Sequence, residues 1–339
     1  MVCPPCDKIP KETEREDHTM KDDWIKAIEQ TLEGIPQGCL AEGGPPHPIP
    51  HWTGRGRMET FSLFPGLTLS HLCFQGEEFP HHHDAQQAAL EITHCRRGRV
   101  GWAMKEGLTL YLGPGDLSLH PMDCCAHSLL RFPLSYYEGF SLSLDPEVLA
   151  SSLPPALAQG GFVPQRLLQV FCPQGRPATL TARAELDHIF LPLYDLPPTL
   201  RLPYYTLKAQ ELFLYLSRQE APGEKPSNQY LSQQVETVRA IHDQLMAHPH
   251  QRPTIEALAK EHHMNTSTLK AVFKAVYGQP IAAHMKHHRM QQAARLLRET
   301  DLSVGEIAQQ MGYENQSKFS KVFRDTFQTL PTEYRKQKT

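Results

Sequence analysis

The sequence predicts an α+β protein in which an N-terminal β-barrel or sandwich that carries some helices precedes an all-helical C-terminal domain. A chain of 339 residues is long enough for two domains, each with its own core. Residues 58–144 contain short apolar runs separated by turn residues, a rhythm typical of all-β domains. Beyond Asn228 the apolar residues recur at helical spacing instead.

The composition changes at the same place. Residues 235–339 hold 15 Lys and Arg against 10 Asp and Glu, a net charge of +5, whereas the rest holds 19 against 27, a net charge of −8. All eight cysteines lie at or before Cys172, and only four of the 29 prolines lie beyond residue 234. The two halves are therefore different domains.

Composition also excludes several classes of protein. Apolar residues make up 40% and charged residues 21%, which excludes wholesale disorder, collagen-like repeats and a membrane bundle. No apolar stretch approaches the roughly 18 residues of a membrane helix, and the first residues are charged rather than signal-like. We therefore expect a cytoplasmic protein without membrane contact, and its cysteines as free thiols.

Turn and helix signals divide the N-terminal half. Gly113-Pro114-Gly115-Asp116 is a strong turn signal, and Asp145-Pro146 begins a helical stretch with an N-cap and a first-turn proline. Ala178–Tyr194 and Tyr204–Gln219 have the apolar spacing of helices that cover a sheet or pair with a second subunit. The predicted segments are a leader (1–50), a β-rich domain (51–177), a helical dimerisation or coupling segment (178–220), a linker (221–230) and a C-terminal domain (231–339).

The C-terminal domain contains an internal repeat. Thr254–Ala259 and Ser303–Ala308 match at a spacing of 49 residues, and Phe273 matches Phe323 at a spacing of 50. Each copy reads as a short helix, a turn and a second helix, and the second copy opens with a Ser303/Glu306 capping box and turns at Gly312. Two helix-turn-helix units are predicted.

The second helix of each copy has an apolar inward face and a polar outward face. The outward residues carry hydroxyl, amide and cationic groups, which bind phosphates and read base edges in the major groove of double-stranded DNA. The candidate DNA contacts are Thr266, Ser267, Thr268, Lys270 and Lys274 in copy one, and Asn315, Gln316, Ser317, Lys318, Lys321 and Arg324 in copy two.

One uninterrupted helix is predicted between the copies, over Pro280–Leu297. Such a connector would hold the two outward faces about one DNA turn apart, roughly 34 Å. Arg295 is a candidate phosphate contact, whereas Arg289 fits equally well as an internal tie to an acidic residue.

These residues resemble the AraC-type transcription regulators. The resemblance covers residues 235–338 and rests on Ile307-Ala308, on the run from Gly312 to Arg324, and on Leu330-Pro331-Thr332-Glu333-Tyr334-Arg335. The chain departs from the family pattern at Gln328-Thr329-Leu330-Pro331, where the family usually has Gly-x-Thr-Pro. The resemblance implies sequence-specific promoter binding, RNA polymerase as a partner, and a cupin-like N-terminal sensory domain. Because residues 51–220 are more than DNA reading needs, we expect them to bind a small-molecule effector and to contribute to a homodimer.

Candidate effector-binding residues in the N-terminal domain are His81, His83, Trp102 and Tyr111, chosen as polar or aromatic side chains able to line a barrel mouth. Phe79-Pro80-His81-His82-His83 is similar to the opening of metal-binding cupins, and Glu91, His94 and His120 are possible further ligands. The gap from His83 to Glu91 is longer than that pattern prefers, so a surface histidine cluster is favoured and no metal or cofactor is expected. The alternatives are a metal-dependent cupin enzyme fused to a DNA-binding domain, and an architectural DNA binder of weak sequence preference.

Overall fold

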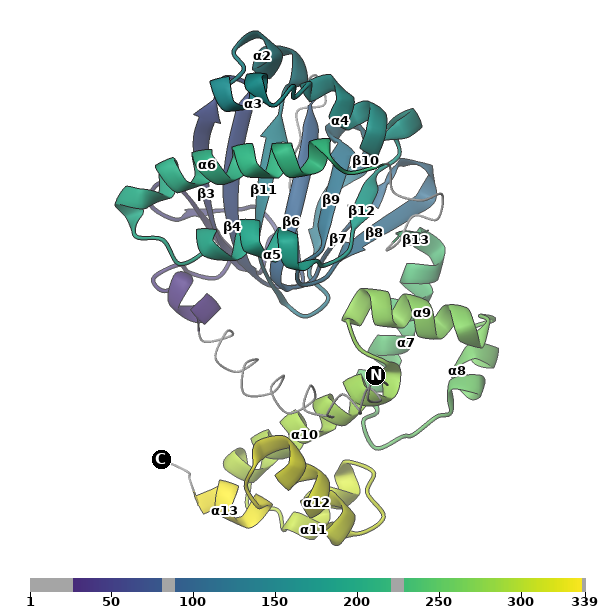
Figure 1. Ribbon diagram of the computed structural model, residues 1–339. Helices are drawn as coiled ribbons and strands as arrows, with labels where there is room; N and C mark the ends of the chain where they lie inside the picture. The colour runs from purple at the N-terminus through teal and green to yellow at the C-terminus, as the bar shows by residue number, and fades with distance from the viewer. Residues whose placement is uncertain (1–26, 81–88, 221–228, 337–339) are drawn as a thin grey trace, which may run out of the picture.

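The computed structural model describes residues 27–80, 89–220 and 229–336, and it divides into two lobes (Figure 1). The N-terminal lobe holds two β-sheets and a layer of helices, and the C-terminal lobe is helical. This confirms the predicted α+β class, with a sheet-rich N-terminal part and a helical C-terminal part. None of the helices in these ranges is long and apolar enough to span a membrane.

The larger sheet has eight strands in the order β12-β9-β6-β11-β4-β3-β1-β2. Its pairs are antiparallel except for β1 and β3, which run parallel. The strands are β1 (Cys39–Glu42), β2 (His47–Pro48), β3 (Arg55–Phe64), β4 (Leu67–Gln75), β6 (Leu90–Gly98), β9 (Leu117–Pro121), β11 (Tyr136–Leu144) and β12 (Ala178–Leu180).

The smaller sheet has five antiparallel strands in the order β13-β8-β7-β10-β5. They are β5 (Glu78–Pro80), β7 (Val100–Met104), β8 (Leu108–Leu112), β10 (Cys125–Arg131) and β13 (Gln229–Leu231). The predicted turn at Gly113–Asp116 joins β8 to β9, and the Asp116 carboxylate accepts the Gly113 N–H at 2.8 Å.

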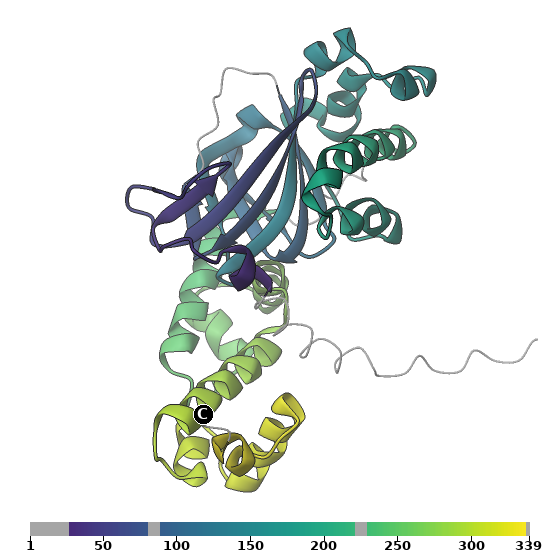
Figure 2. The ribbon, with the colours of Figure 1, turned by 90° about the vertical axis from the view of Figure 1, so that its left-hand side faces the viewer.

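Each face of the large sheet is covered. Between the sheets lies an aromatic core to which Phe74, Trp102 and Tyr137 contribute. On the other face, the sheet packs against helices (Figure 2) through a second core that includes Phe140, Phe190 and Phe213. These helices are α2 (Pro146–Ser151), α3 (Pro155–Gln159), α4 (Pro164–Phe171), α5 (Ala184–Phe190) and α6 (Pro198–Ser217), with 3-10 turns η1 (Lys105–Gly107), η2 (Met122–Cys124), η3 (Pro173–Gly175) and η4 (Leu191–Leu193).

The local sequence signals predicted the start of helix α2 correctly, but the sequence did not predict the short strands that pair with distant partners. Asp145 caps α2 as predicted, because its carboxylate accepts the N–H groups of Glu147 and Val148 at 3.0 Å. The segment predicted as a leader contains β1 and β2, and the predicted helix Ala178–Tyr194 begins with strand β12. Both are short strands recruited by the sheet, and nothing in their own sequence requires a strand.

The C-terminal lobe consists of helices that pack around two separate cores. The first core includes Leu269 and Phe273, and the second includes Phe319 and Phe323. The long helix α10 contributes Met285 to the first core and Met290 to the second. The helices are α7 (Ser232–Ala247), α8 (Ile255–Glu261), α9 (Thr266–Tyr277), α10 (Ile281–Glu299), α11 (Val304–Gln310), α12 (Gln316–Phe327) and α13 (Pro331–Lys336).

The lobes are joined through the smaller sheet. Strand β13, at the end of the predicted linker, pairs with β8, and Tyr111 of β8 is buried in the first helical core. The Arg99 guanidinium, which is 9% exposed, donates to the Ala275 carbonyl of α9. Thr109 and Ser232 are joined by a hydroxyl hydrogen bond of 2.8 Å. The segment 178–220 packs mainly against the far face of the large sheet, which is one of the two roles predicted for its helices.

Candidate nucleic-acid interface

Helices α9 and α12 are the second helices of the two helix-turn-helix units, and we call them the recognition helices. Each starts at an asparagine whose side chain caps it: Asn265 accepts the Ser267 N–H, and Asn315 accepts the Lys318 N–H, both at 2.8 Å. The capping box predicted in the second copy is present, since Ser303 and Glu306 each accept the other's backbone N–H. The two units therefore fold from local signals, as the repeat predicts.

The inward face of each recognition helix is buried. Leu269 and Phe273 of α9, like Phe319 and Phe323 of α12, are fully covered by the other helices of their units. Because these residues fall three or four positions apart, the remaining face of each helix points to solvent. The cores thus orient the polar faces outward.

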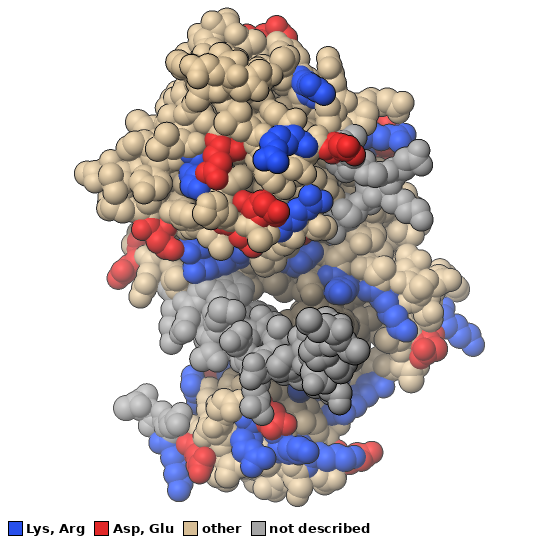
Figure 3. All heavy atoms as spheres, viewed as in Figure 1, with Lys and Arg blue, Asp and Glu red and all other residues tan. Residues whose placement is uncertain are grey.

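The candidate DNA contacts lie on those outward faces. In α9, Ser267, Lys270 and Lys274 are exposed, while Thr266 and Thr268 are half-buried. At α12, all six predicted residues are exposed: Asn315, Gln316, Ser317, Lys318, Lys321 and Arg324. Figure 3 shows Lys and Arg side chains on the C-terminal lobe, with fewer acidic groups between them.

Three of these side chains on the recognition helices already have partners in the free protein. The Ser267 hydroxyl donates to Asn265 Oδ1 at 2.7 Å. The side-chain oxygen of Asn315 is used by the helix cap, which leaves its NH₂ group to donate elsewhere. The Lys318 ammonium lies 3.2 Å from the Glu314 carboxylate, and both groups are exposed, so this ion pair is weak. A phosphate or a base edge can replace Glu314 as the partner of Lys318 at small cost.

Helix α10 connects the two units without a break, as predicted. Arg289 is buried and donates to the backbone carbonyls of Pro249 and Gln251, at 2.6 and 3.1 Å. It is therefore an internal tie, but to carbonyls rather than to an acidic residue. Arg295 is exposed, and its Nε atom lies 3.7 Å from a Glu299 carboxylate oxygen. The Arg298 guanidinium lies over the Tyr334 ring, 4.6 Å from the ring centroid.

Equivalent turns of the two units use the same backbone conformation with different residues. Gly312 (φ 70°) in the second turn corresponds to His263 (φ 51°) in the first, and Gly278 (φ 78°) after α9 corresponds to Gln328 (φ 56°) after α12. At Gly312 a Cβ would lie 2.4 Å from the His250 carbonyl oxygen, so that position requires glycine. Gln328 keeps the left-handed turn at the place where the sequence departs from the family pattern, so the geometry of the last turn is preserved.

The candidate effector residues have different positions. His81 and His83 lie outside the described residues. Trp102 is buried in the core between the sheets, and its ring lies 5.1 Å from that of His120. Tyr111 is fully buried against the C-terminal lobe, so it does not line a barrel mouth. No local sequence pattern indicates that Tyr111 contacts the C-terminal lobe.

The possible metal ligands in the N-terminal lobe do not converge. Glu91 and His120 face each other across β6 and β9, with Glu91 Oε2 and His120 Nε2 at 3.3 Å. His94 lies three residues after Glu91 on β6 and points to the other face, where its ring stacks on Phe190 at 4.0 Å. In the ranges that the structure describes, no three His, Cys, Asp or Glu side chains are placed to surround one ion. Strand alternation alone separates residues 91 and 94.

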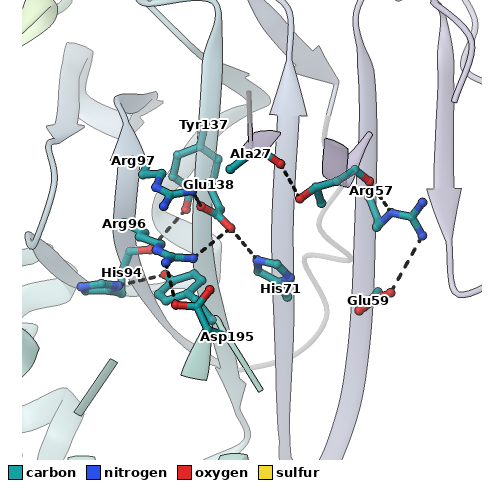
Figure 4. A network of polar contacts seen from close by, with 12 residues as sticks. Ala27, Arg57, Glu59, His71, His94, Arg96, Arg97, Tyr137, Glu138 and Asp195 are labelled. Carbon is teal, nitrogen blue, oxygen red and sulfur yellow. Dashed lines mark hydrogen bonds and ion pairs between the residues drawn. The ribbon is translucent and has the colours of Figure 1, made fainter. Parts of the chain in front are cut away.

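A buried acidic group that sequence reasoning missed links the large sheet to its helical layer (Figure 4). Glu138 of β11 is 5% exposed and lies 3.4 Å from His71 and from both Arg96 and Arg97. Burial alone raises the pKa of this carboxyl, but the His71 hydrogen bond and the two guanidinium charges outweigh it and hold the pKa below its usual value. Arg96 also pairs with Asp195 at 3.1 Å, so the network is a structural tie.

Known proteins resemble the part of the chain that carries the recognition helices. Residues 258–337 match a family model described as a helix-turn-helix domain. The HTH-type transcriptional regulator AlkR of Acinetobacter baylyi is 32% identical over 98 residues, 29% of this chain and 31% of AlkR. The regulatory protein SoxS of Salmonella typhimurium is 33% identical over 88 residues, 26% of this chain and 82% of SoxS.

Among solved structures, the DNA-binding domain of AdpA in complex with a target DNA is 26% identical, with a TM-score of 0.29. The match covers 30% of this chain and 90% of that domain. The chain thus spans most of SoxS but less than a third of the length of AlkR.

Proposed function

Because the chain belongs to the AraC family of transcription regulators, we propose that it binds specific double-stranded DNA through α9 and α12 and thereby controls transcription. One observation carries the proposal most directly. Two recognition helices of the same construction stand on one basic lobe, each with a buried apolar face and an exposed face of hydroxyl, amide and cationic groups.

We propose that the two recognition helices contact different parts of one DNA site. Helix α10 holds both units, because it contributes to each of their cores. A rigid connector favours binding to two successive major grooves, about 34 Å apart on one face of the duplex. We propose that residues near the helix starts, such as Ser267 and Gln316, contact base edges, and that Lys274, Lys321 and Arg324 contact phosphates.

The N-terminal lobe is proposed to bind a small-molecule effector in the space between its two sheets. Trp102 Nε1 is buried there and has no hydrogen-bond partner among the described residues. A buried polar atom without a partner costs free energy, which a ligand with a hydrogen-bonding group would recover. For regulation, the effector must bind the DNA-binding and non-binding states with different affinity.

We further propose that the protein is a cytoplasmic homodimer that acts on RNA polymerase and has no catalytic activity. Support for the dimer comes from α6, whose residues Leu200, Tyr204 and Leu207 are 44%, 41% and 63% exposed. Their spacing places them in one stripe on the outer face of the helix. A second copy of the same helix would cover this apolar stripe in a symmetric interface.

Binding of operator-length DNA to the full chain, measured by fluorescence anisotropy at several salt concentrations, tests the proposed function. Lys318→Ala and Gln316→Ala are expected to weaken specific binding by about 1–3 kcal/mol where the side chain reads a base, with relaxed preference at one position. Lys321→Ala should weaken binding to every sequence and lower the salt dependence by about one contact.

Lys105→Ala removes an exposed lysine from the N-terminal lobe and serves as the matched control, with unchanged affinity expected. Equal affinity for the parent and for all three α12 variants would remove that helix from the interface. Equal affinity for specific and random DNA would favour an architectural role instead.

A further inference from the structure

Two histidines of the C-terminal lobe face each other across α7 and α10. The Nε2 atoms of His242 and His284 are 3.1 Å apart, and the ring centroids are 5.1 Å apart at an angle of 57°. Two imidazole nitrogens that bind one ion at about 2.0–2.1 Å with tetrahedral angles lie about 3.3–3.4 Å from each other. The pair, which is hydrogen-bonded as it stands, is therefore within about 0.3 Å of the separation of two ligands of one metal.

The His242 ring is positioned by an aromatic stack and by an acidic side chain. It stacks on Tyr277 with a centroid distance of 4.1 Å and an angle of 12°, and its side chain is 15% exposed. Its Nδ1 atom lies 3.3 Å from the Asp243 carboxylate. A carboxylate in this position accepts the Nδ1 proton, which leaves the lone pair of Nε2 directed toward His284.

A third histidine lies one turn further along α10. His284 and His288 are spaced i and i+4, which puts both on one face of the helix, as in zinc-binding helices. Burial first, and then the positive charges of His242, Arg289 and Arg295, lower the pKa of His288. Among the described residues no three such side chains surround one ion as they stand, so ligation by His288 requires a change of its rotamer.

We propose that His242, His284 and His288 bind one divalent transition-metal ion of the Zn²⁺ or Ni²⁺ class, with water completing the coordination. Imidazole nitrogen is a preferred ligand of these ions. The carboxylates of Asp243 and Glu77 act on His242 and favour a cation, while Arg289 and Arg295 act on His288 and oppose it. The ion would tie α7 to α10, and both helices pack against the recognition helix α9.

The test is isothermal titration of the untagged full chain with Ni²⁺, in a parent variant whose His81, His82 and His83 are all replaced by alanine. That background removes the other histidine cluster. Ni²⁺ is chosen because it binds imidazole well and the buried thiols compete only weakly for it. We expect one Ni²⁺ per chain and a rise in Tm on addition of the metal. His242→Gln and His284→Gln should each abolish both effects, and His288→Gln should weaken binding at least tenfold.

His248→Gln is the matched control, because this exposed histidine at the end of α7 lies outside the cluster, and it should bind Ni²⁺ like the parent. Helical circular dichroism and DNA affinity in the absence of metal establish that each variant is folded. Failure of the parent to bind, or full binding by His242→Gln or His284→Gln, would overturn the site. Unchanged affinity in His288→Gln would overturn the assignment of the third ligand.

Discussion

Replacement of Tyr111 by alanine is expected to uncouple the two lobes. The ring is fully buried among side chains of α7 and α9, including Val235, Val238 and Tyr277. Removal of a large buried aromatic side chain costs about 3–5 kcal/mol of the free energy of unfolding, because both the transfer energy and the contacts across the new cavity are lost. This loss falls on the docking of the lobes, since Tyr111 belongs to one lobe and its neighbours to the other.

Two optical signals separate the lobes during denaturation by urea. All three tryptophans, Trp24, Trp52 and Trp102, precede residue 103, so fluorescence follows the N-terminal half. Circular dichroism at 222 nm follows the helices of both lobes, and α7–α13 of the C-terminal lobe hold more helical residues than α2–α6 of the N-terminal lobe. In the parent the two transitions should coincide, and in Tyr111→Ala the helical transition should move to lower urea and separate from the fluorescence transition.

Tyr111→Phe is the matched control for the ring. The Tyr111 hydroxyl is buried without a hydrogen-bond partner among the described residues, so its removal should change the stability by less than about 1 kcal/mol. Gly101→Ala offers an independent perturbation, since its Cβ would lie 2.3 Å from Tyr111 Cε1 and would displace the ring. Coincident transitions with an unchanged midpoint in Tyr111→Ala would refute the proposed role of the ring in docking the lobes. An equal loss of the free energy of unfolding in Tyr111→Phe would mean that the hydroxyl, not the ring, provides the stabilisation.

Other parts of the structure give further expectations. Gln328→Gly should stabilise the C-terminal lobe by about 0.5–1 kcal/mol in urea denaturation because Gln328 has a positive φ, and the equivalent exchange Gly278→Gln should destabilise it; the same sign for both would contradict this. Ser303→Ala should cost about 1 kcal/mol through loss of the cap on α11, measured in the same way, and no change would mean that the cap is dispensable. The pKa of Glu138 is lowered in the folded state, so its stabilising contribution is present above the unfolded pKa of about 4.3 and is lost as the pH falls through the lower folded value. Glu138→Gln should therefore destabilise the protein by about 3 kcal/mol at pH 7 and give a flatter acid limb, and parallel pH profiles for variant and parent would exclude this role. Residues 231–339 alone should be helical by circular dichroism and should bind DNA, and an unfolded fragment would contradict the domain boundary.

The helix-turn-helix units were readable from the sequence because their determinants are local. The capping pair Ser303 and Glu306, the cap Asn315 and the turn at Gly312 act on residues at most four positions away, or on a single close contact. The 49- and 50-residue spacing of the repeat then identified the inward and outward faces of both recognition helices before any contact was known. For the same reason all six residues predicted on the outward face of α12 are exposed.

Contacts between distant segments were decided only by the tertiary structure. The burial of Tyr111 against α7, the Arg99 hydrogen bond to Ala275 and the facing of His242 and His284 each join residues more than 40 positions apart. The short strands β1, β12 and β13 form because neighbouring strands offer unpaired backbone groups, and their own residues carry no strong strand pattern. Local sequence determines which helices form and how they end, whereas the pairing of sheets and lobes depends on the shape that the whole chain adopts.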